Sequence, residues 1–166
     1  GLNYAFSAEW GYLTSCPTNM GTGLRASCLV HLPGLALAGL LNRTLETLPR
    51  AGLIARGLYG EGTRVVGDLF QIANATSLGR TEPEILTAIE RSVSQLVKAE
   101  KESRHRLCEG AGLAKLEDVV FRSAGSLTHA RLLSFEEASR HLSALRMGLA
   151  MGWKLPGSLS LINELS

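Results

Sequence analysis

The sequence contains little cysteine and no long uninterrupted apolar run. Its 3 cysteines are Cys16, Cys28 and Cys108, and no two of them form a CxxC pair, which argues against both a secreted disulfide framework and a zinc site. The longest apolar run, residues 28–41, contains Pro33 and is shorter than the roughly 20 residues that span a bilayer. We therefore expect a cytoplasmic protein without a metal site of its own and without a membrane partner.

The sequence also lacks a large excess of positive or negative residues. The 17 Lys and Arg residues and the 15 Asp and Glu residues give a formal net charge of +2, and the basic residues are spread along the chain. Because nucleic-acid binding needs a basic patch, we expect no nucleic-acid partner. No basic residue precedes Arg25, so a secretory signal sequence is not expected, and the first residue reads as a cut end.

Apolar periodicity predicts a mixture of strands and helices up to about residue 108. Strands are expected at residues 26–32, 53–58 and 68–75. Between the first two strands, leucines recur at helical spacing and predict one amphipathic helix that contains Leu37, Leu41, Leu45 and Leu48.

A long helix is predicted from Thr81 to about Leu107. Thr81 and Glu84 form a capping-box pattern at its start. The buried stripe of this helix is expected to comprise Leu86, Ile89, Val93 and Leu96. The charged residues from Lys98 to Arg106 are predicted to form a solvated face.

Beyond residues 109–112 the strand signals end and only helical patterns remain. Ser134 and Glu137 repeat the capping box, at the start of a helix whose inner face is expected to comprise Ala138, Leu142, Leu145 and Leu149. We therefore divide the chain into a mixed part, residues 1–108, and a helical C-terminal region, residues 109–166.

Residues 16–27, with the sequence Cys-Pro-Thr-Asn-Met-Gly-Thr-Gly-Leu-Arg-Ala-Ser, place a thiol, a tight turn and a cation before a buried strand. The turn formers predict a constrained loop that presents Cys16, where the Thr18 hydroxyl could hydrogen-bond a thiolate. Arg25 could hold phosphate oxygens with its planar cation. Taken alone, an inert cysteine and a surface ion pair are the simpler interpretation. The glycine spacing matches neither a Walker A motif nor the dinucleotide fingerprint, so phosphate would have to be bound by arginines.

Residues 56–62, with the sequence Arg-Gly-Leu-Tyr-Gly-Glu-Gly, place a cation and a carboxylate around glycines. Glycine-flanked loops often close over a nucleotide, where they bring a charge to the reacting atoms and exclude water. An ordinary hairpin turn with exposed charges is the alternative interpretation of this loop.

The two motifs together resemble the signature of the ATP:guanidino phosphotransferases, the phosphagen kinase family. The resemblance rests on the run Cys-Pro-Thr-Asn-x-Gly-Thr-x-x-Arg-Ala-Ser, on the loop Arg-Gly-x-x-Gly-Glu, and on the following strand that ends in Asn74. Within the family, residues 9–16, the Arg-Gly-Leu-Tyr-Gly-Glu loop and residues 122–131 are similar to bacterial protein-arginine kinases of the McsB type. The resemblance implies an α+β fold, in which a phosphagen kinase catalytic domain with a twisted, mainly antiparallel sheet flanked by helices precedes a small all-helical region.

The resemblance also implies roles for individual residues. Cys16 becomes the thiol beside the substrate guanidinium, and Glu61 the carboxylate that orients the guanidinium and takes its proton. Arg25 and Arg56 become phosphate-binding arginines. The implied ATP site is lined by Arg25, Ala26, Ser27, Cys28, Leu29, Arg56, Gly57, Leu58, Tyr59, Gly60 and Glu61. His31 has no role in the family pattern and is expected to be a partly buried strand residue. ATP and Mg2+ are the implied cofactors.

The function that the resemblance implies is transfer of the γ-phosphate of ATP to arginine side chains of proteins, in a stress response. The implied partners are protein substrates that bear arginine, an activator protein, the Clp protease system and a second copy of the chain in a homodimer. Two alternatives stay open: a phosphagen-type kinase that acts on a free guanidino compound, and a non-catalytic nucleotide-binding regulatory module. Tyr59 argues against the former, because small-molecule phosphagen kinases usually carry arginine at that position.

The sequence departs from the family pattern at both ends. Upstream of the position of Cys16, family members carry two further phosphate-binding arginines and an acidic guanidine-binding segment. Downstream, protein-arginine kinases carry a phosphoarginine-sensing motif. Since none of these is present, we expect this chain to be incomplete and, by itself, inactive.

Overall fold

The computed structural model describes residues 3–58, 65–110 and 112–165. The chain forms two compact units, which are described separately. Unit 1 comprises Gly1–Val30, Asn42–Arg56 and Phe70–Val97, and unit 2 comprises His31–Leu41, Gly57–Leu69 and Lys98–Ser166. The division at residues 108 and 109, which was made on the sequence, stays a prediction.

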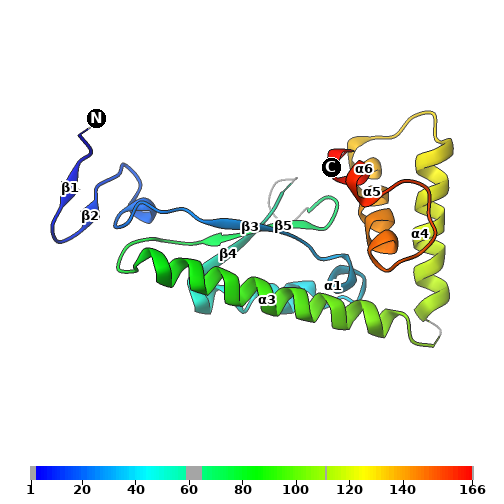
Figure 1. The fold of residues 1–166 in the computed structure, drawn as a ribbon, viewed down its shortest axis with the longest axis horizontal. Helices are drawn as coiled ribbons and strands as arrows, with labels where there is room; N and C mark the ends of the chain where they lie inside the picture. Colours follow the sequence, from blue (N-terminus) through cyan, green and yellow to red (C-terminus); the bar gives the residue numbers. More distant parts are fainter. Residues whose placement is uncertain (1–2, 59–64, 111, 166) are drawn as a thin grey trace. The chain divides into compact units, whose positions relative to one another are not determined.

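A three-stranded sheet contains the strands that the sequence predicts. They are β3 (Ser27–His31), β4 (Leu53–Gly57) and β5 (Leu69–Asn74), and β5 lies between the other two (Figure 1). Alternate residues face opposite sides of a strand. Val30, Leu53, Phe70 and Ile72 are buried on one side of the sheet, and Leu69 and Ala73 are buried on the other side of β5. The predicted strands and the α+β class are confirmed.

Backbone hydrogen bonds fix the register of this sheet. Residue numbers fall on one strand as they rise on its neighbour, so both pairs are antiparallel. The bonds, of 2.9 to 3.3 Å, run from Leu32 N–H to Asp68 O, from Asn74 N–H to Ala26 O, from Ala75 N–H to Gly52 O and from Leu58 N–H to Leu69 O.

A small hairpin precedes the sheet in the sequence. Its strands are β1 (Phe6–Ser7) and β2 (Gly11–Tyr12), which pair in the antiparallel sense with Phe6 opposite Tyr12. The two rings meet edge to face, with centroids 5.3 Å apart. Tyr12 and Gly21 also exchange backbone hydrogen bonds of 2.8 and 3.2 Å, which tie the hairpin to the loop that follows Cys16.

The prediction of one amphipathic helix between β3 and β4 is wrong. The structure has two short helices, α1 (Pro33–Leu37) and α2 (Leu41–Leu45), and then a 3-10 turn, η2 (Leu48–Ala51). The first helix ends before Gly39, whose φ of +68° is a conformation that glycine adopts at little cost. The leucine spacing continued across this break, so periodicity alone did not reveal it.

The long helix α3 (Glu82–Leu107) confirms the prediction of its start and end. The Thr81 N–H and hydroxyl both donate to Glu84 Oε2, over 2.7 and 2.8 Å. Leu86, which was expected in the buried stripe, is 53% exposed, and Ile85 is fully buried in its place. The buried face at the start of α3 therefore includes Ile85 and not the predicted Leu86.

The prediction that residues 98–106 form a solvated face is wrong for Glu100. This residue is 4% exposed, and its carboxylate accepts 2.8 Å hydrogen bonds from the Gly34 and Leu35 N–H groups. The first N–H groups of a helix have no partner within the helix, so Glu100 caps the start of α1. Arg104 Nε lies 2.6 Å from Glu100 Oε1 and balances its charge.

Unit 2 ends in three helices, which confirms the prediction of an all-helical tail. They are α4 (Gly112–His129), α5 (Phe135–Ala150) and α6 (Leu159–Leu165). The capping box at Ser134 is complete, because Glu137 N–H donates to Ser134 Oγ and Ser134 N–H donates to Glu137 Oε2. Two small apolar clusters hold the helices together, one of Leu116, Val120 and Met147 and one of Ala124, Leu145 and Ile162.

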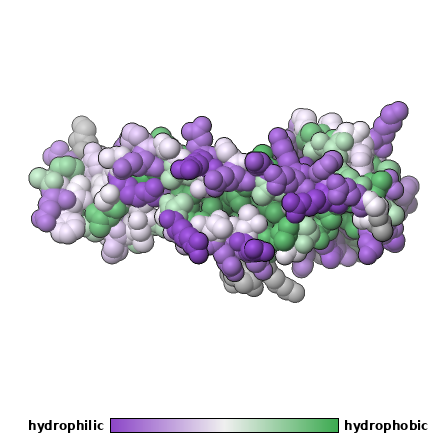
Figure 2. Space-filling view, turned by 90° about the horizontal axis from the view of Figure 1, so that it is seen from below, coloured by the Kyte–Doolittle hydropathy of each residue, from purple (hydrophilic) through white to green (hydrophobic). Residues whose placement is uncertain are grey.

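The face of the molecule drawn in Figure 2 is mixed in character. Figure 2 shows hydrophilic side chains dispersed among apolar ones on the face that it draws. Within the described ranges, no helix combines the length and the apolar composition that crossing a membrane would require.

Replacement of Glu100 tests its role at the start of α1. Glu100→Ala is expected to lower the free energy of unfolding by about 3 kcal/mol, because it leaves two buried N–H groups and Arg104 without their partner. Urea unfolding measures the loss. Glu102→Ala, an exposed change on the same helix, is the matched control and should stay within about 0.5 kcal/mol of the wild type. Equal losses in the two variants would contradict the assignment.

Candidate active site

Cys16 is presented at the surface by a short turn, as expected. It is exposed and directly precedes the 3-10 turn η1 (Pro17–Asn19). Its Sγ lies 3.0 Å from Thr18 Oγ1, which is the contact predicted from the sequence. Hydrogen bonds from the Thr18 side chain and backbone lower the pKa of the Cys16 thiol below its ordinary value. The loop therefore stabilises the thiolate more than an ordinary surface cysteine would be stabilised, and the thiolate is the anionic form that can face a cation.

The loop after β5 holds the Cys16 loop in place. Ser77, which is 1% exposed, donates from its N–H to Thr18 O over 3.2 Å and from its hydroxyl to Met20 O over 2.9 Å. The backbones approach so closely that a Cβ on Gly21 would lie 2.8 Å from Ser77 O. Glycine is therefore required at position 21, which also has a φ of +98°.

Asn74 connects the same loop to the segment that contains Arg25. It is 3% exposed, its Oδ1 accepts from Ala26 N–H over 2.9 Å, and its Nδ2 donates to Leu24 O and Thr76 O over 3.0 and 3.3 Å. The backbone on both sides of Arg25 is thereby fixed. The sequence identified Asn74 only as the end of a strand and gave no signal for Ser77.

One face of the sheet has exposed residues beside this junction. The register places Leu29, Gln71 and Arg56 in one row across the three strands, on the side opposite Val30, Phe70 and Ile72. On the same side of β5, Leu69 and Ala73 are buried. Gln71 Nε2 donates to Ser27 Oγ over 3.0 Å, which places Ser27 on the same face. Ser27, Leu29 and Arg56 are all exposed, so a flat ligand could lie against them.

The two candidate phosphate-binding arginines are available to an anion. Arg25 and Arg56 are exposed, and neither has a carboxylate within 4.0 Å among the residues that the structure describes. Their planar guanidinium groups suit phosphate oxygens. The described ranges hold no group of three or more His, Cys, Asp or Glu side chains that could bind a metal ion.

The remaining predicted site residues fall into two groups. Gly57 ends β4, and Leu58 follows it with its N–H bonded to Leu69 O over 2.9 Å. Tyr59, Gly60 and Glu61 lie outside the described residues, so their roles stay predictions from the sequence. His31 is the partly buried last residue of β3, as expected.

Comparison with known families defines the class of this protein. The family model described as ATP:guanido phosphotransferase, C-terminal catalytic domain, matches residues 1–103. The chain belongs to this family. Residues 113–166 match a second model, the protein-arginine kinase McsB C-terminal domain.

Similar relatives are named protein-arginine kinases. One from Halalkalibacterium halodurans is 45% identical over 164 residues, which are 99% of this chain and 46% of the relative. One from Geobacillus stearothermophilus is 44% identical over 164 residues, which are 99% of this chain and 45% of the relative. The chain thus spans about half the length of these curated relatives.

Solved structures support the fold. The substrate-free duplicated taurocyamine kinase from Schistosoma mansoni is 32% identical, with a TM-score of 0.51, and the match covers 71% of this chain and 17% of that one. The same kinase with bound transition state analog components is 35% identical, with a TM-score of 0.50, and the match covers 59% and 13%.

The effect of Thr18 on the thiol can be measured directly. Thr18→Val removes the hydroxyl and is expected to raise the pKa of Cys16, so that alkylation by iodoacetamide begins at a higher pH than in the wild type. Mass spectrometry of the Cys16 peptide across a pH series gives the midpoint. Thr18→Ser keeps the hydroxyl and should leave the midpoint nearly unchanged. Coincident profiles of Thr18→Val and the wild type would show that the hydrogen bond does not act on the thiol.

Proposed function

We propose that the natural protein containing this chain transfers the γ-phosphate of ATP to arginine side chains of proteins. The observation that carries the proposal is the junction at Asn74 and Ser77, which ties the Cys16 loop and the Arg25 segment to the end of β5. The junction fixes the loop of Cys16, whose thiol pKa is lowered, and the segment of Arg25, which has no carboxylate within 4.0 Å among the described residues. Family membership and relatives named protein-arginine kinases support the same reaction.

The proposed chemistry fits a guanidinium nucleophile. Guanidinium nitrogens are poor nucleophiles because their lone pairs are delocalised and the pKa lies above about 12. Anionic partners must therefore align the group and accept a proton. In the proposed reaction, the Cys16 thiolate lies against the substrate guanidinium and Glu61 takes the proton.

The phosphoryl group needs cations more than covalent chemistry. A substrate nitrogen attacks the γ-phosphorus, a P–N bond forms, and the P–O bond to the β-phosphate breaks so that ADP leaves with the bonding electrons. Arg25 and Arg56 hold the phosphates and stabilise the charge that gathers on their oxygens. Mg2+, when bound to the nucleotide, would neutralise part of the same charge. The backbone from Ala26 to Leu29 and the Gly57–Leu58 segment border the nucleotide.

Phosphoryl transfer to a free guanidino compound is the second candidate. The likeness to the taurocyamine kinase supports it, whereas Tyr59 favours an arginine presented on a protein.

For the protein-directed reaction we also propose the cytoplasm as the location, and an activator protein, the Clp protease system and a second copy of the chain as partners.

Incubation of the natural protein with labelled ATP distinguishes the candidates. We expect label on arginine side chains of an arginine-rich protein, located by mass spectrometry, and much less label on free arginine. Preferential labelling of free arginine would select the second candidate. Nucleotide binding without transfer to either acceptor would indicate a regulatory module.

Replacement of Arg56 tests the phosphate site. Arg56→Ala is expected to reduce the rate of transfer about a hundredfold, because the transition state loses a cation. Steady-state kinetics with varied ATP measures the effect. Arg91→Ala, which changes an exposed arginine of α3, is the control and should leave the rate unchanged. A similar rate in the two variants would remove Arg56 from the proposed site.

A further inference from the structure

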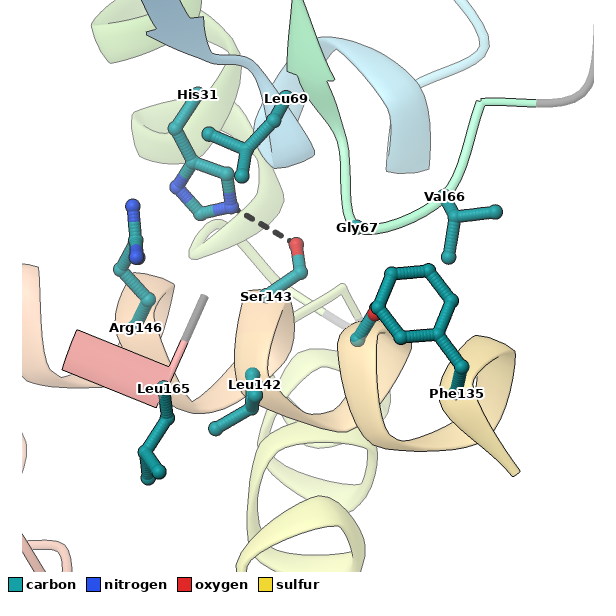
Figure 3. A pocket seen from close by; sticks show the side chains of 10 residues that line it. His31, Val66, Gly67, Leu69, Phe135, Leu142, Ser143, Arg146 and Leu165 are labelled. Atoms are coloured by element: carbon teal, nitrogen blue, oxygen red, sulfur yellow. Dashed lines mark hydrogen bonds between the residues drawn. The ribbon is translucent and has the colours of Figure 1, made fainter. Parts of the chain in front are cut away.

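Unit 2 contains a buried chain of polar side chains that the proposed reaction does not use. Ser143, on α5, is 4% exposed and lies between partners from two other segments. Its Oγ is 2.8 Å from His31 Nε2 and 2.6 Å from Asp68 Oδ2. Figure 3 shows the His31 ring pointing toward the Ser143 hydroxyl. His31 and Ser143 border a cavity of about 20 Å³, which has room for about one water molecule.

The direction of each hydrogen bond follows from the protonation of the chain. Burial, with Arg146 and Arg104 nearby, lowers the pKa of His31 to about 3, so its ring is neutral and carries one N–H. Ser143 has one proton and donates it to the Asp68 carboxylate. His31 Nε2–H therefore donates to Ser143 Oγ, and no member of the chain lacks a partner.

Asp68 needs this support because of its backbone. Its φ is 54°, a conformation that residues other than glycine rarely adopt. Such a conformation persists where surrounding contacts hold it. Two hydrogen bonds hold Asp68: its carboxylate accepts from Ser143, and its backbone carbonyl accepts from Leu32 N–H over 2.9 Å.

The partners of Ser143 stand at the ends of two strands of the sheet. His31 is the last residue of β3, and Asp68 directly precedes β5. Leu69, the first residue of β5, accepts a 2.9 Å hydrogen bond from the N–H of Leu58. Leu58 belongs to the proposed nucleotide site. Its backbone partner Leu69 directly follows Asp68, the residue that Ser143 binds.

We propose that Ser143 is a positioning residue for ATP: its hydroxyl ties helix α5 to the ends of β3 and β5 and thereby holds Leu58 in its place. The inference rests on the proposed function, because it requires an ATP site at Leu58. The Ser143 hydroxyl links the helical C-terminal region to Leu58 through Asp68 and Leu69. A displacement of α5 should then weaken ATP binding without touching the reacting groups.

Two serines on one helix provide a matched test. Ser143→Ala is expected to weaken ATP binding about tenfold, measured by calorimetry on the natural protein, and to raise KM for ATP more than it lowers kcat. It should also speed amide exchange in peptides that contain Leu32 and Leu58. Ser139→Ala is the control, because Ser139 borders the same cavity but makes no side-chain hydrogen bond to another described residue. It should change neither quantity.

Changes at Asp68 provide a second test that does not depend on Ser143→Ala being folded. Asp68→Asn keeps an acceptor for Ser143 and tolerates a positive φ, so ATP binding should stay close to that of the wild type. Asp68→Gly removes the carboxylate without backbone strain and should weaken ATP binding like Ser143→Ala.

The outcomes separate this inference from the proposed function. Unchanged ATP affinity in Ser143→Ala or Asp68→Gly would overturn the inference alone, as would an equal loss of affinity in Ser139→Ala. A wild-type protein that binds no ATP would instead refute the proposed function. Amide exchange at Leu32 and Leu58 would then still decide whether Ser143 holds the ends of the strands.

Discussion

The side-chain amide of Asn74 makes the contacts on which the candidate site depends. It accepts from Ala26 N–H and donates to Leu24 O and Thr76 O, and it is almost completely buried. Inside a protein such bonds are costly to lose, because each broken one leaves a polar group without water. Neither the Arg25 segment nor the Cys16 loop belongs to the sheet. Their places relative to β5 are therefore set by Asn74 and its neighbour Ser77.

In unit 2, two other buried polar side chains also hydrogen-bond segments that are distant in the sequence. Glu100 reaches from α3 to the free N–H groups at the start of α1, and Ser143 reaches from α5 to the ends of β3 and β5. In each case one buried polar side chain satisfies groups of distant segments. Apolar packing holds the helices together without direction, whereas these hydrogen bonds fix positions to within a few tenths of an ångström.

Local signals predicted much of the fold. The three strands, both capping boxes and the helical tail followed from alternation, helical spacing and turn residues. The predictions were wrong where one sequence pattern was compatible with two different structures. Leucine spacing passed over the break at Gly39, and the apolar stripe of α3 could include either Leu86 or Ile85. The charge of Glu100 indicated solvent, since the backbone groups that it binds are far away in the sequence.

The sequence by itself determined the chemistry: a thiol with a neighbouring hydroxyl, two arginines and a carboxylate in motifs that identify the family. The role of Glu61 still rests on the sequence alone. Only the tertiary structure decided which buried polar side chains join distant segments of the chain. The contacts of Asn74, Glu100 and Ser143 join residues 48, 66 and 112 positions apart. Spacing within a motif cannot report such contacts, because a hydrogen bond between distant segments exists only after folding has brought donor and acceptor together.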